Sequence, residues 1–444
     1  MSTPPLAPKP TRVRYSVIAV MAFAAFLMYI DRMCLSQMVS ADTFQHDLQL
    51  DKGAVSTVLG VFFFAYALGQ MPAAWFGDRF GARSLLTWLI ALWSAFTLLT
   101  GCAVGLWSLL LARVGCGLAE AGAYSCSGSL VPRWVPLQER GRANAIIAGG
   151  GRVGGAVAPF LSAIVIGWLG TWRTPGWVYG ATGLLFAGIY WWVARDRPSE
   201  HPRVNDAERA LIERDLPEEL RGPARPTAKI RTPWAGLLCS RDMWLMCLFQ
   251  FLTNAGWVFL VTYMPTFLRE TKGLDEKTAG FMATMALFVG CVGMLAGGWL
   301  TDVLTRRLGI RLGRMIPMAY SRIAGAAAYL VCLGFDSPWI AVAAFGIVAA
   351  MTDISIPAAW GYIQDVGGRN IASAYAWPNM WGNFGAALTP PLLTWINKRF
   401  DSQHNWHASL VFLAAAFLLS GVAAFWMRAD VKIAAAEEVA TDDV

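Results

Sequence analysis

The sequence predicts an all-α membrane protein of twelve transmembrane helices in two six-helix bundles. Of its 444 residues, 56% are hydrophobic and only 15% are charged, whereas soluble domains carry about 25% charged residues. Apolar stretches of about 20 residues, the length that crosses the hydrocarbon of a bilayer, recur along the chain. The 21 Trp and 43 Gly suit such a protein, because Trp anchors at lipid headgroups and Gly lets helices pack closely.

The expected spans follow one another with short connections, except after the sixth. Arg12 and Arg14 precede or open the first span, which is longer than the apolar core of a signal peptide and has no small-residue cleavage site, so we expect it to be retained. The approximate bounds of the twelve spans are 14–38, 54–76, 83–103, 105–131, 142–168, 175–194, 242–267, 278–301, 314–334, 338–361, 370–396 and 407–427.

One long polar segment divides the chain into two halves. Within it, Asn205-Asp-Ala-Glu208 has the pattern of a capping box and predicts a short amphipathic helix. The segment has no Gly-rich phosphate loop, so we interpret it as a linker. The expected organisation is a tail at 1–13, a bundle at 14–194, a cytoplasmic linker at 195–241, a second bundle at 242–428 and a tail at 429–444.

The basic residues orient the spans. Cytoplasmic termini place most of the 36 Lys and Arg on the cytoplasmic side, as the positive-inside rule requires. The net charge of +7 is therefore explained by topology and not by nucleic-acid binding. We expect a monomeric, multi-pass plasma-membrane protein, located in the inner membrane if the source is a Gram-negative bacterium, with no nucleic-acid partner.

Cysteine and histidine exclude several kinds of site. The eight Cys show no C-x-x-C spacing, and all four His fall outside the expected spans. We expect buried thiols, no metal and no cofactor. A membrane enzyme is disfavoured because no Ser/His/Asp, Cys/His or metal constellation can form within the spans. Any proton path through the membrane has to use carboxylates, and H⁺ is the expected coupling ion.

Charged residues inside the N-terminal spans are candidates for function because burying them in a bilayer is costly. Asp31 and Arg32 are adjacent in span 1, whereas Arg113 and Glu120 are seven positions apart in span 4. That spacing is two helical turns, which puts both on one face about 10 Å apart. The face continues one turn further to Tyr124.

Two interpretations of these charges remain open. Arg32 can neutralise Glu120 and Arg113 can neutralise Asp31, which would make all four structural. Alternatively, Arg152 in span 5 adds a third guanidinium to two acids, and a buried surplus of guanidinium calls for an anion. Protonation of the acids would free the arginines for that anion, which is the minimal mechanism of proton-coupled anion symport.

This second interpretation assigns roles to individual residues. Asp31 and Glu120 are predicted proton carriers, and Arg113 is predicted to bind the carboxylate of the substrate. Arg152 lies among the glycines of 149–155, which leave room around a guanidinium. It can bind a second anionic group, or it can pair with Glu120 or cap neighbouring carbonyls.

The C-terminal spans supply mainly neutral polar and aromatic groups, with Asp353 as the main acid and Arg322 as the base. Asn379 and Asn383 share a helix face. For each such residue, helix-to-helix hydrogen bonding is as good an interpretation as substrate contact. The substrate-binding candidates in this half are Asn254, Trp257, Asp353, Trp377, Asn379 and Asn383.

A charged motif follows both the second and the eighth span. An acid at a helix end followed by basic residues can pair across a hinge in one conformational state. The alternative is a positive-inside loop with an incidental Asp. The candidate gating residues are Asp78, Arg79 and Arg83 in the first copy and Asp302, Arg306 and Arg307 in the second.

The spans, the division into six and six, and the pattern G-x-x-x-D-R-x-G-x-R resemble the major facilitator superfamily, although Ala74 replaces the first Gly of the pattern. The charged residues also resemble those of its anion:cation symporter branch, which includes bacterial sugar-acid carriers and vesicular organic-anion carriers. That likeness rests on Tyr29-Ile-Asp31-Arg32, Tyr66, the Arg113/Glu120 spacing and Asn379-Met-Trp-Gly-Asn383.

The resemblance implies that the two matching acids carry the coupling proton and that the matching Arg, Tyr and Asn line the substrate site. The sequence departs from the sugar-acid pattern in span 5, where Gly151 and Arg152 stand in a region that can present Gln. The expected function is proton-coupled symport of an organic anion, such as a sugar acid or other carboxylate, by alternating access. Exchange of a phosphorylated or multianionic solute is the alternative within transport, and a non-transporting membrane solute sensor is the alternative outside it.

Overall fold

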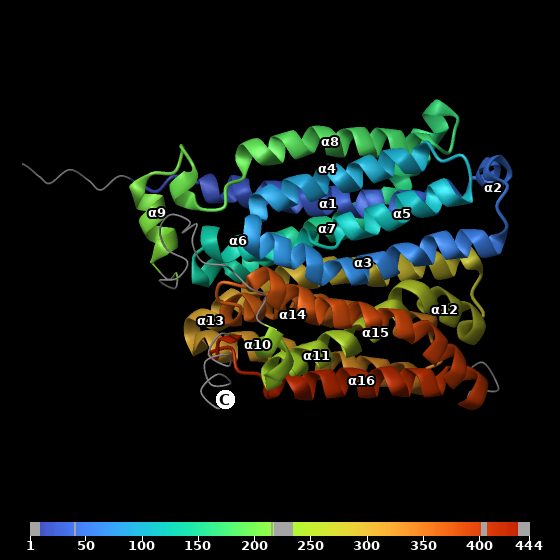
Figure 1. Ribbon diagram of the computed structural model, residues 1–444. Coiled ribbons are helices and arrows are strands. Elements are labelled where there is room, and N and C mark those ends of the chain that lie inside the picture. The colour runs from blue at the N-terminus through green and yellow to red at the C-terminus, as the bar shows by residue number, and fades with distance from the viewer. Residues whose placement is uncertain (1–8, 40, 215, 217–233, 401–405, 434–444) are drawn as a thin grey trace, which may run out of the picture. The chain divides into compact units, whose positions relative to one another are not determined.

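The computed structural model describes residues 9–39, 41–214, 216, 234–400 and 406–433. Parts of the expected tails and of the expected linker therefore lie outside the described residues. All regular secondary structure in the described ranges is helical (Figure 1). The chain divides into two compact units, Met1–Thr232 with Gly368–Ser373, and Pro233–Gly367 with Ala374–Val444.

The first unit contains the six N-terminal spans, and each coincides with a helix or helix pair (Figure 1). Two single turns of 3-10 helix lie at Leu137–Glu139 and Pro198–Glu200. The helices are α1 (Val13–Val39), α2 (Asp42–Leu48), α3 (Lys52–Phe80), α4 (Ala82–Gly101), α5 (Leu106–Glu120), α6 (Ala123–Trp134), α7 (Arg140–Leu169), α8 (Thr174–Val193) and α9 (Asp206–Glu213).

The second unit contains the other six expected spans. Its longest helix carries spans 8 and 9, which turn into one another at Gly309, a residue with the left-handed φ of 82° that glycine tolerates. The elements are α10 (Trp234–Cys239), α11 (Arg241–Val258), a π-helical turn (Phe259–Tyr263), α12 (Met264–Lys272), α13 (Glu276–Gly334), α14 (Pro338–Val366), α15 (Ile371–Phe400) and α16 (His407–Phe425).

In the described part of the chain, nine helical segments are long and apolar enough to cross a membrane. The number is below twelve because α13 counts once for two expected spans and because α8 and α15 are not among the nine. α8 is rich in Gly, Trp and Tyr, and α15 contains Pro378, Pro390 and Pro391. The helical membrane architecture is thus confirmed, whereas the count of twelve and the side of the termini stay predictions.

Glycines on α7 bring that helix against α1. A Cβ at Gly150 would lie 2.2 Å from the carbonyl oxygen of Ala22, and one at Gly154 would lie 2.3 Å from that of Phe26. No larger side chain fits at either position. The close contact explains the glycine-rich sequence here and fixes the site residues of α1 and α7 in one register.

The fourth span is broken immediately after Glu120. α5 ends there and α6 begins at Ala123, and a Cβ at the intervening Gly122 would lie 2.6 Å from Leu89 of α4. On α5 itself, a Cβ at Gly117 would lie 2.5 Å from the carbonyl oxygen of Phe62 in α3. The break and the two glycines hold Glu120 in the interior of the unit, where its side chain is fully buried.

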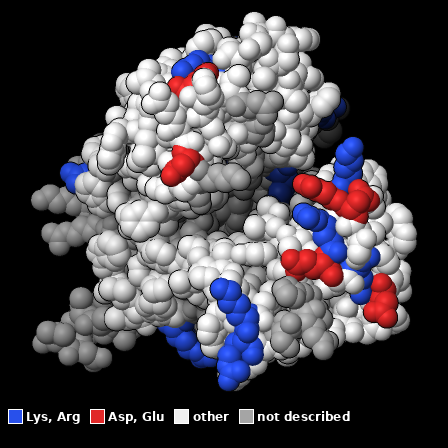
Figure 2. All heavy atoms as spheres, turned by 90° about the vertical axis from the view of Figure 1, so that its right-hand side faces the viewer, with Lys and Arg blue, Asp and Glu red and all other residues white. Residues whose placement is uncertain are grey.

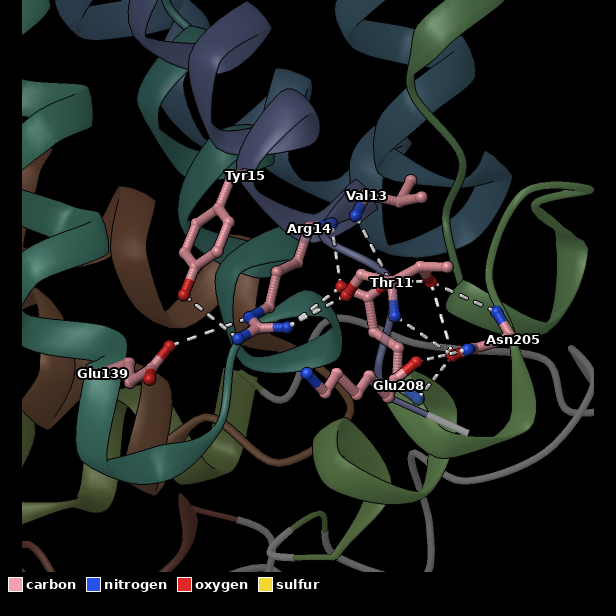
Figure 3. A network of polar contacts seen from close by, with 8 residues as sticks. Thr11, Val13, Arg14, Tyr15, Glu139, Asn205 and Glu208 are labelled. Carbon is pink, nitrogen blue, oxygen red and sulfur yellow. Dashed lines mark hydrogen bonds and ion pairs between the residues drawn. The ribbon is translucent and has the colours of Figure 1, made fainter. Parts of the chain in front are cut away.

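The linker helix α9 forms as predicted, and Asn205 caps it by accepting a hydrogen bond of 2.9 Å from the backbone N–H of Glu208. The reciprocal half of the predicted capping box is wrong. The carboxylate of Glu208 instead accepts from the backbone N–H groups of Val13 (3.2 Å) and Arg14 (3.3 Å), the first residues of α1 (Figure 3). The linker thus supplies the acidic cap that the first span lacks.

Further bonds extend this network. Glu208 also accepts from Thr11 Oγ1 at 2.5 Å and from Arg14 Nη1 at 3.0 Å. The Nε of Arg14 in turn lies 3.7 Å from Oε2 of Glu139, which is located between α6 and α7 (Figure 3). Three parts of the chain far apart in sequence are therefore joined at one end of the first unit.

Charge is sparse on the surface that Figure 2 shows. Acidic and basic side chains occur there in small groups, and most of the visible surface belongs to other residues. This view looks along the helices onto the ends at which α2 and α12 lie in Figure 1.

Candidate functional site

The centre of the candidate site is an ion pair between α1 and α5. Arg32 approaches one oxygen of Glu120, Oε2, through both Nε (2.9 Å) and Nη2 (2.7 Å). The Glu120 side chain is completely buried and that of Arg32 is 11% exposed. The predicted neutralisation of Glu120 by Arg32 is therefore present in this structure.

Aromatic rings surround the guanidinium of Arg32. Its Cζ lies 4.9 Å from the ring centre of Tyr29, 4.8 Å from Tyr66 and 5.2 Å from Phe62. A guanidinium at these distances is attracted by the ring faces. Three aromatic rings therefore hold Arg32 in addition to its ion pair with Glu120.

Arg113 has a different environment from Arg32. It is 3% exposed, and its Cζ lies 4.5 Å from the ring centre of Phe62, which thus contacts two guanidinium groups. Among the described residues, no carboxylate lies within 4.0 Å of Arg113, so the pairing with Asp31 does not form as an ion pair. Arg113 is a buried cation without a directly bound counter-ion from the described chain.

Asp31 is 1% exposed, and neither of its carboxylate oxygens has a hydrogen-bond partner within the described ranges. The polar groups around it include Trp93 and Ser94 of α4, Arg113 and Glu120. Its Oδ2 faces α8, since a Cβ at Gly183 would lie 3.8 Å away. A buried carboxyl in such surroundings is a good candidate to carry a proton.

Tyr124 and Arg152 complete the group in the first unit. The hydroxyl of Tyr124 would lie 2.5 Å from a Cβ at Gly151, and the ring of Tyr29 would lie 2.9 Å from the same point. Arg152 is partly buried and lies near Tyr124. The glycines of α7 therefore make room for two tyrosines and for α1.

The structure thus gathers the N-terminal candidates in one place. They are Asp31, Arg32, Tyr66, Arg113, Glu120, Tyr124 and Arg152. Sequence reasoning missed Phe62 as the ring between two arginines, because a Phe in an apolar span looks like any lipid-facing or core residue. The only available signal was its spacing of four from Tyr66, on which it stacks at 6.0 Å.

In the second unit, three of the candidate amides lie where α11 meets α15. The Nδ2 of Asn254 would lie 2.6 Å from a Cβ at Gly382, so a side chain there would displace it. Asn383 donates from Nδ2 to the carbonyl oxygen of Asn379 at 2.8 Å. These contacts are between or within helices, and the substrate roles of the three residues stay predictions.

The other candidates of this unit have different packing partners. Trp377 packs edge-on against Trp234 of α10 (6.3 Å) and Trp244 of α11 (5.6 Å), whereas Trp257 packs against the apolar core of the unit. Asp353 of α14 is 1% exposed. Its nearest cation is the fully buried Arg322 of α13.

Within the described chain, Arg322 is held without a direct ion pair. It donates from Nη2 to the Thr352 carbonyl at 3.3 Å and to the Ser355 hydroxyl, and its Cζ lies about 5 Å from Phe249 and Phe417. Asp353 and Arg322 together form a second buried pair of opposite charges, on the α13–α14 face of the unit.

The gating candidates have varied surroundings. Asp78 is 8% exposed and accepts hydrogen bonds from the backbone N–H of Ala372 (3.1 Å) and Ser373 (2.9 Å), which belong to the segment grouped with the first unit. Arg83 donates from its backbone N–H to Asp196 at 3.0 Å and stacks on Trp191 at 3.7 Å. Asp78 therefore binds main-chain donors.

The remaining gating candidates differ in burial. The exposed guanidinium of Arg79 stacks on Trp75 at 5.1 Å. In the second copy, Asp302 is fully buried, whereas Arg306 and Arg307 are exposed. The gating roles of these six residues stay predictions.

Comparisons with known proteins agree with this architecture. The probable galactarate/D-glucarate transporter GudP of Bacillus subtilis is 28% identical over 426 residues, which cover 92% of this chain and 90% of the relative. The probable sulfoacetate transporter SauU of Cupriavidus necator is 28% identical over 394 residues, which cover 88% and 89%. The D-galactonate transporter of Escherichia coli O6:H1 is 32% identical over 326 residues, which cover 70% and 72%.

A solved structure has the same fold. The proton:xylose symporter XylE, bound to 6-bromo-6-deoxy-D-glucose, superposes with a TM-score of 0.72 at 15% identity and covers 96% of this chain and 98% of its own. The fold and the named relatives are those of membrane transporters and not of enzymes. The model of the Major Facilitator Superfamily matches residues 21–366. The chain belongs to the major facilitator superfamily.

Proposed function

We propose that this protein is a secondary active transporter that moves an organic acid anion together with protons. The observation that carries the proposal is Arg113, a buried guanidinium with no carboxylate of the described chain within 4.0 Å. A planar guanidinium binds a carboxylate through two parallel hydrogen bonds. An anionic substrate would pair directly with a buried charge to which no carboxylate of the described residues binds directly.

The proton would act through Glu120 and Asp31. In this structure the carboxylate of Glu120 binds the guanidinium of Arg32. Protonation of Glu120 would remove the negative charge that holds this guanidinium. Arg32 would then stay in its aromatic cage and turn its donors to the substrate. Asp31, buried without a hydrogen-bond partner among the described residues, is more stable as the neutral acid, so it would be the second carrier.

The substrate class follows from the number of arginines. Arg32 and Arg152 lie beside the tyrosines of the first unit, and Arg113 shares the ring of Phe62 with Arg32. Three guanidinium groups in one place favour a solute with two anionic ends. Galactarate and glucarate carry two carboxylates, and sulfoacetate carries a carboxylate and a sulfonate. The names of GudP and SauU therefore fit the charges of this site, whereas galactonate, named in the third relative, carries one carboxylate. A dianionic organic acid is the proposed substrate.

Uptake into liposomes tests the proposal. Purified protein is reconstituted, the outside is acidified relative to the lumen, and galactarate, glucarate, galactonate and sulfoacetate are offered in turn. We expect accumulation of at least one dianion that a protonophore abolishes. Uptake that requires an internal solute and ignores the pH gradient would replace symport by exchange. Absence of uptake of every organic acid, with saturable binding retained, would favour a sensor.

A further inference from the structure

Glu120 is held from two sides, and the proposed function uses only one of them. Its Oε2 is bound by Arg32, whereas its Oε1 lies 3.4 Å from the thiol of Cys116, one turn earlier on α5. The thiol is fully buried and donates to the carboxylate. Arg32 and Cys116 therefore fix both oxygens of this carboxyl.

The thiol is itself held in place by α4. The hydroxyl of Thr97 lies 4.0 Å from the sulfur of Cys116, and Thr97 is only 2% exposed. A Cβ at the neighbouring Gly115 would lie 2.3 Å from the ring of Phe96, so α4 and α5 are in direct contact beside the thiol. A chain of polar groups thus runs from Thr97 through Cys116 to Glu120.

We propose that Cys116 is a positioning residue for Glu120, which it reaches through a thiol-to-carboxylate hydrogen bond supported by Thr97. The inference rests on the proposed function, in which Glu120 accepts the coupling proton. When Arg32 leaves Oε2, the thiol is the remaining donor that orients the carboxyl. Because a donor favours the charged form of a carboxylate, Cys116 also sets the pH at which Glu120 takes up its proton.

The surroundings of Glu120 contain few other groups that could have this effect. The charged and titratable residues around it are Asp31, Arg32 and Cys34 of α1, Tyr66 of α3, and Arg113 and Cys116 of α5. All of these except the two thiols belong to the proposed proton and substrate machinery, and the thiol of Cys34 donates to the carbonyl oxygen of Asp31 at 3.1 Å. Cys116 can be changed without removing a formal charge, so its influence is separable from theirs.

Three variants and one control test the proposal. Cys116→Ala removes the donor, Cys116→Ser keeps a donor at the same position, and Thr97→Val removes the supporting hydroxyl while nearly keeping the shape. Cys126→Ala is the matched control, because Cys126 is an equally buried thiol of the same unit whose sulfur faces Gly77. Thr97→Val decides the question if Cys116→Ala does not fold.

The primary readout is infrared difference spectroscopy of the purified protein during acid titration, with Glu120→Gln used to assign the protonated carboxyl band of Glu120. We expect Cys116→Ala to move the titration of this band to higher pH by about 0.5–1 unit, since one unit corresponds to about 1.4 kcal/mol. Thr97→Val should move it in the same direction by less. Cys116→Ser and Cys126→Ala should titrate like the parent.

The pH dependence of uptake by liposomes is the second readout, and we expect half-maximal uptake to move in parallel with the band. An unchanged titration in both Cys116→Ala and Thr97→Val would overturn the positioning role, and so would a Cys116→Ser variant that behaves like Cys116→Ala, because this would indicate packing alone. If the parent shows no pH-driven uptake, the proposed symport fails, while the infrared titration still decides the role of Cys116.

Discussion

Replacing Arg113 by Lys keeps the positive charge and removes the planar fork. Lys presents a single ammonium that cannot make two parallel bonds to a carboxylate, and it loses part of the contact that Arg113 makes with Phe62 at 4.5 Å. The substitution therefore separates charge from geometry. A site that needs only a positive potential would tolerate it.

The expected magnitude follows from the second hydrogen bond, which the ammonium of Lys cannot make. One charge-assisted hydrogen bond is worth about 1.5–3 kcal/mol, which corresponds to a roughly 10- to 150-fold loss of affinity. The assay is equilibrium binding of the dianion identified by the uptake screen, measured by calorimetry on protein in detergent. Arg209→Lys is the matched control, because Arg209 is exposed on α9 and pairs with Glu213 at 3.1 Å.

We expect the control to bind like the parent. Binding by Arg113→Lys within twofold of the parent would refute the assignment of Arg113 as the carboxylate ligand. Its buried charge would then have to be explained by long-range interaction with Asp31.

Three further predictions concern other parts of the first unit. Arg152→Gln should cost a dianion such as galactarate about tenfold more affinity than the monoanion galactonate, measured by competition binding, and equal losses would make Arg152 structural. Phe62→Leu should weaken binding about three- to tenfold in the same assay, because two guanidinium groups lose their shared ring. Glu208→Ala should lower the free energy of unfolding by about 3–5 kcal/mol, since it strips a buried partner from Arg14 and the cap from α1; thermal unfolding in detergent checks this. Glu213→Ala on the same helix should change stability by less than about 0.5 kcal/mol, and equal shifts for the two variants would contradict the capping role of Glu208.

The sequence predicted those features that depend on local pattern. Apolar stretches of the sequence located the long helices of both units. The capping pattern at Asn205 located α9. The seven-residue spacing placed Arg113 and Glu120 on one side of α5. Arg32 and its partner Glu120 could also be identified from the sequence, because an unpaired charge inside a membrane span costs free energy.

The missed features depend on neighbours that are distant in sequence. Glu208 matches the pattern of a capping box within α9, but its carboxylate accepts from the first backbone N–H groups of α1. The fold brings the linker back to the start of the first span, which a local pattern does not show. The glycines beside Arg152 lie against the backbone of α1 and against the rings of Tyr29 and Tyr124, which the sequence does not show. Phe62 and Cys116 gain importance only through the arginines and the carboxylate that the fold brings to them.

In the proposed mechanism, protonation of buried carboxyls drives anion transport. A comparison of two activities of Glu120→Gln in liposomes tests this step. Counterflow exchange needs the substrate site and alternating access but no net proton movement, whereas accumulation against a gradient needs the proton. Gln mimics the protonated acid and cannot release it.

We expect Glu120→Gln to retain exchange of the dianion and to lose accumulation driven by a pH gradient. Asp31→Asn should show the same separation of the two activities. Undiminished pH-driven accumulation in both variants would rule out Glu120 and Asp31 as the proton carriers.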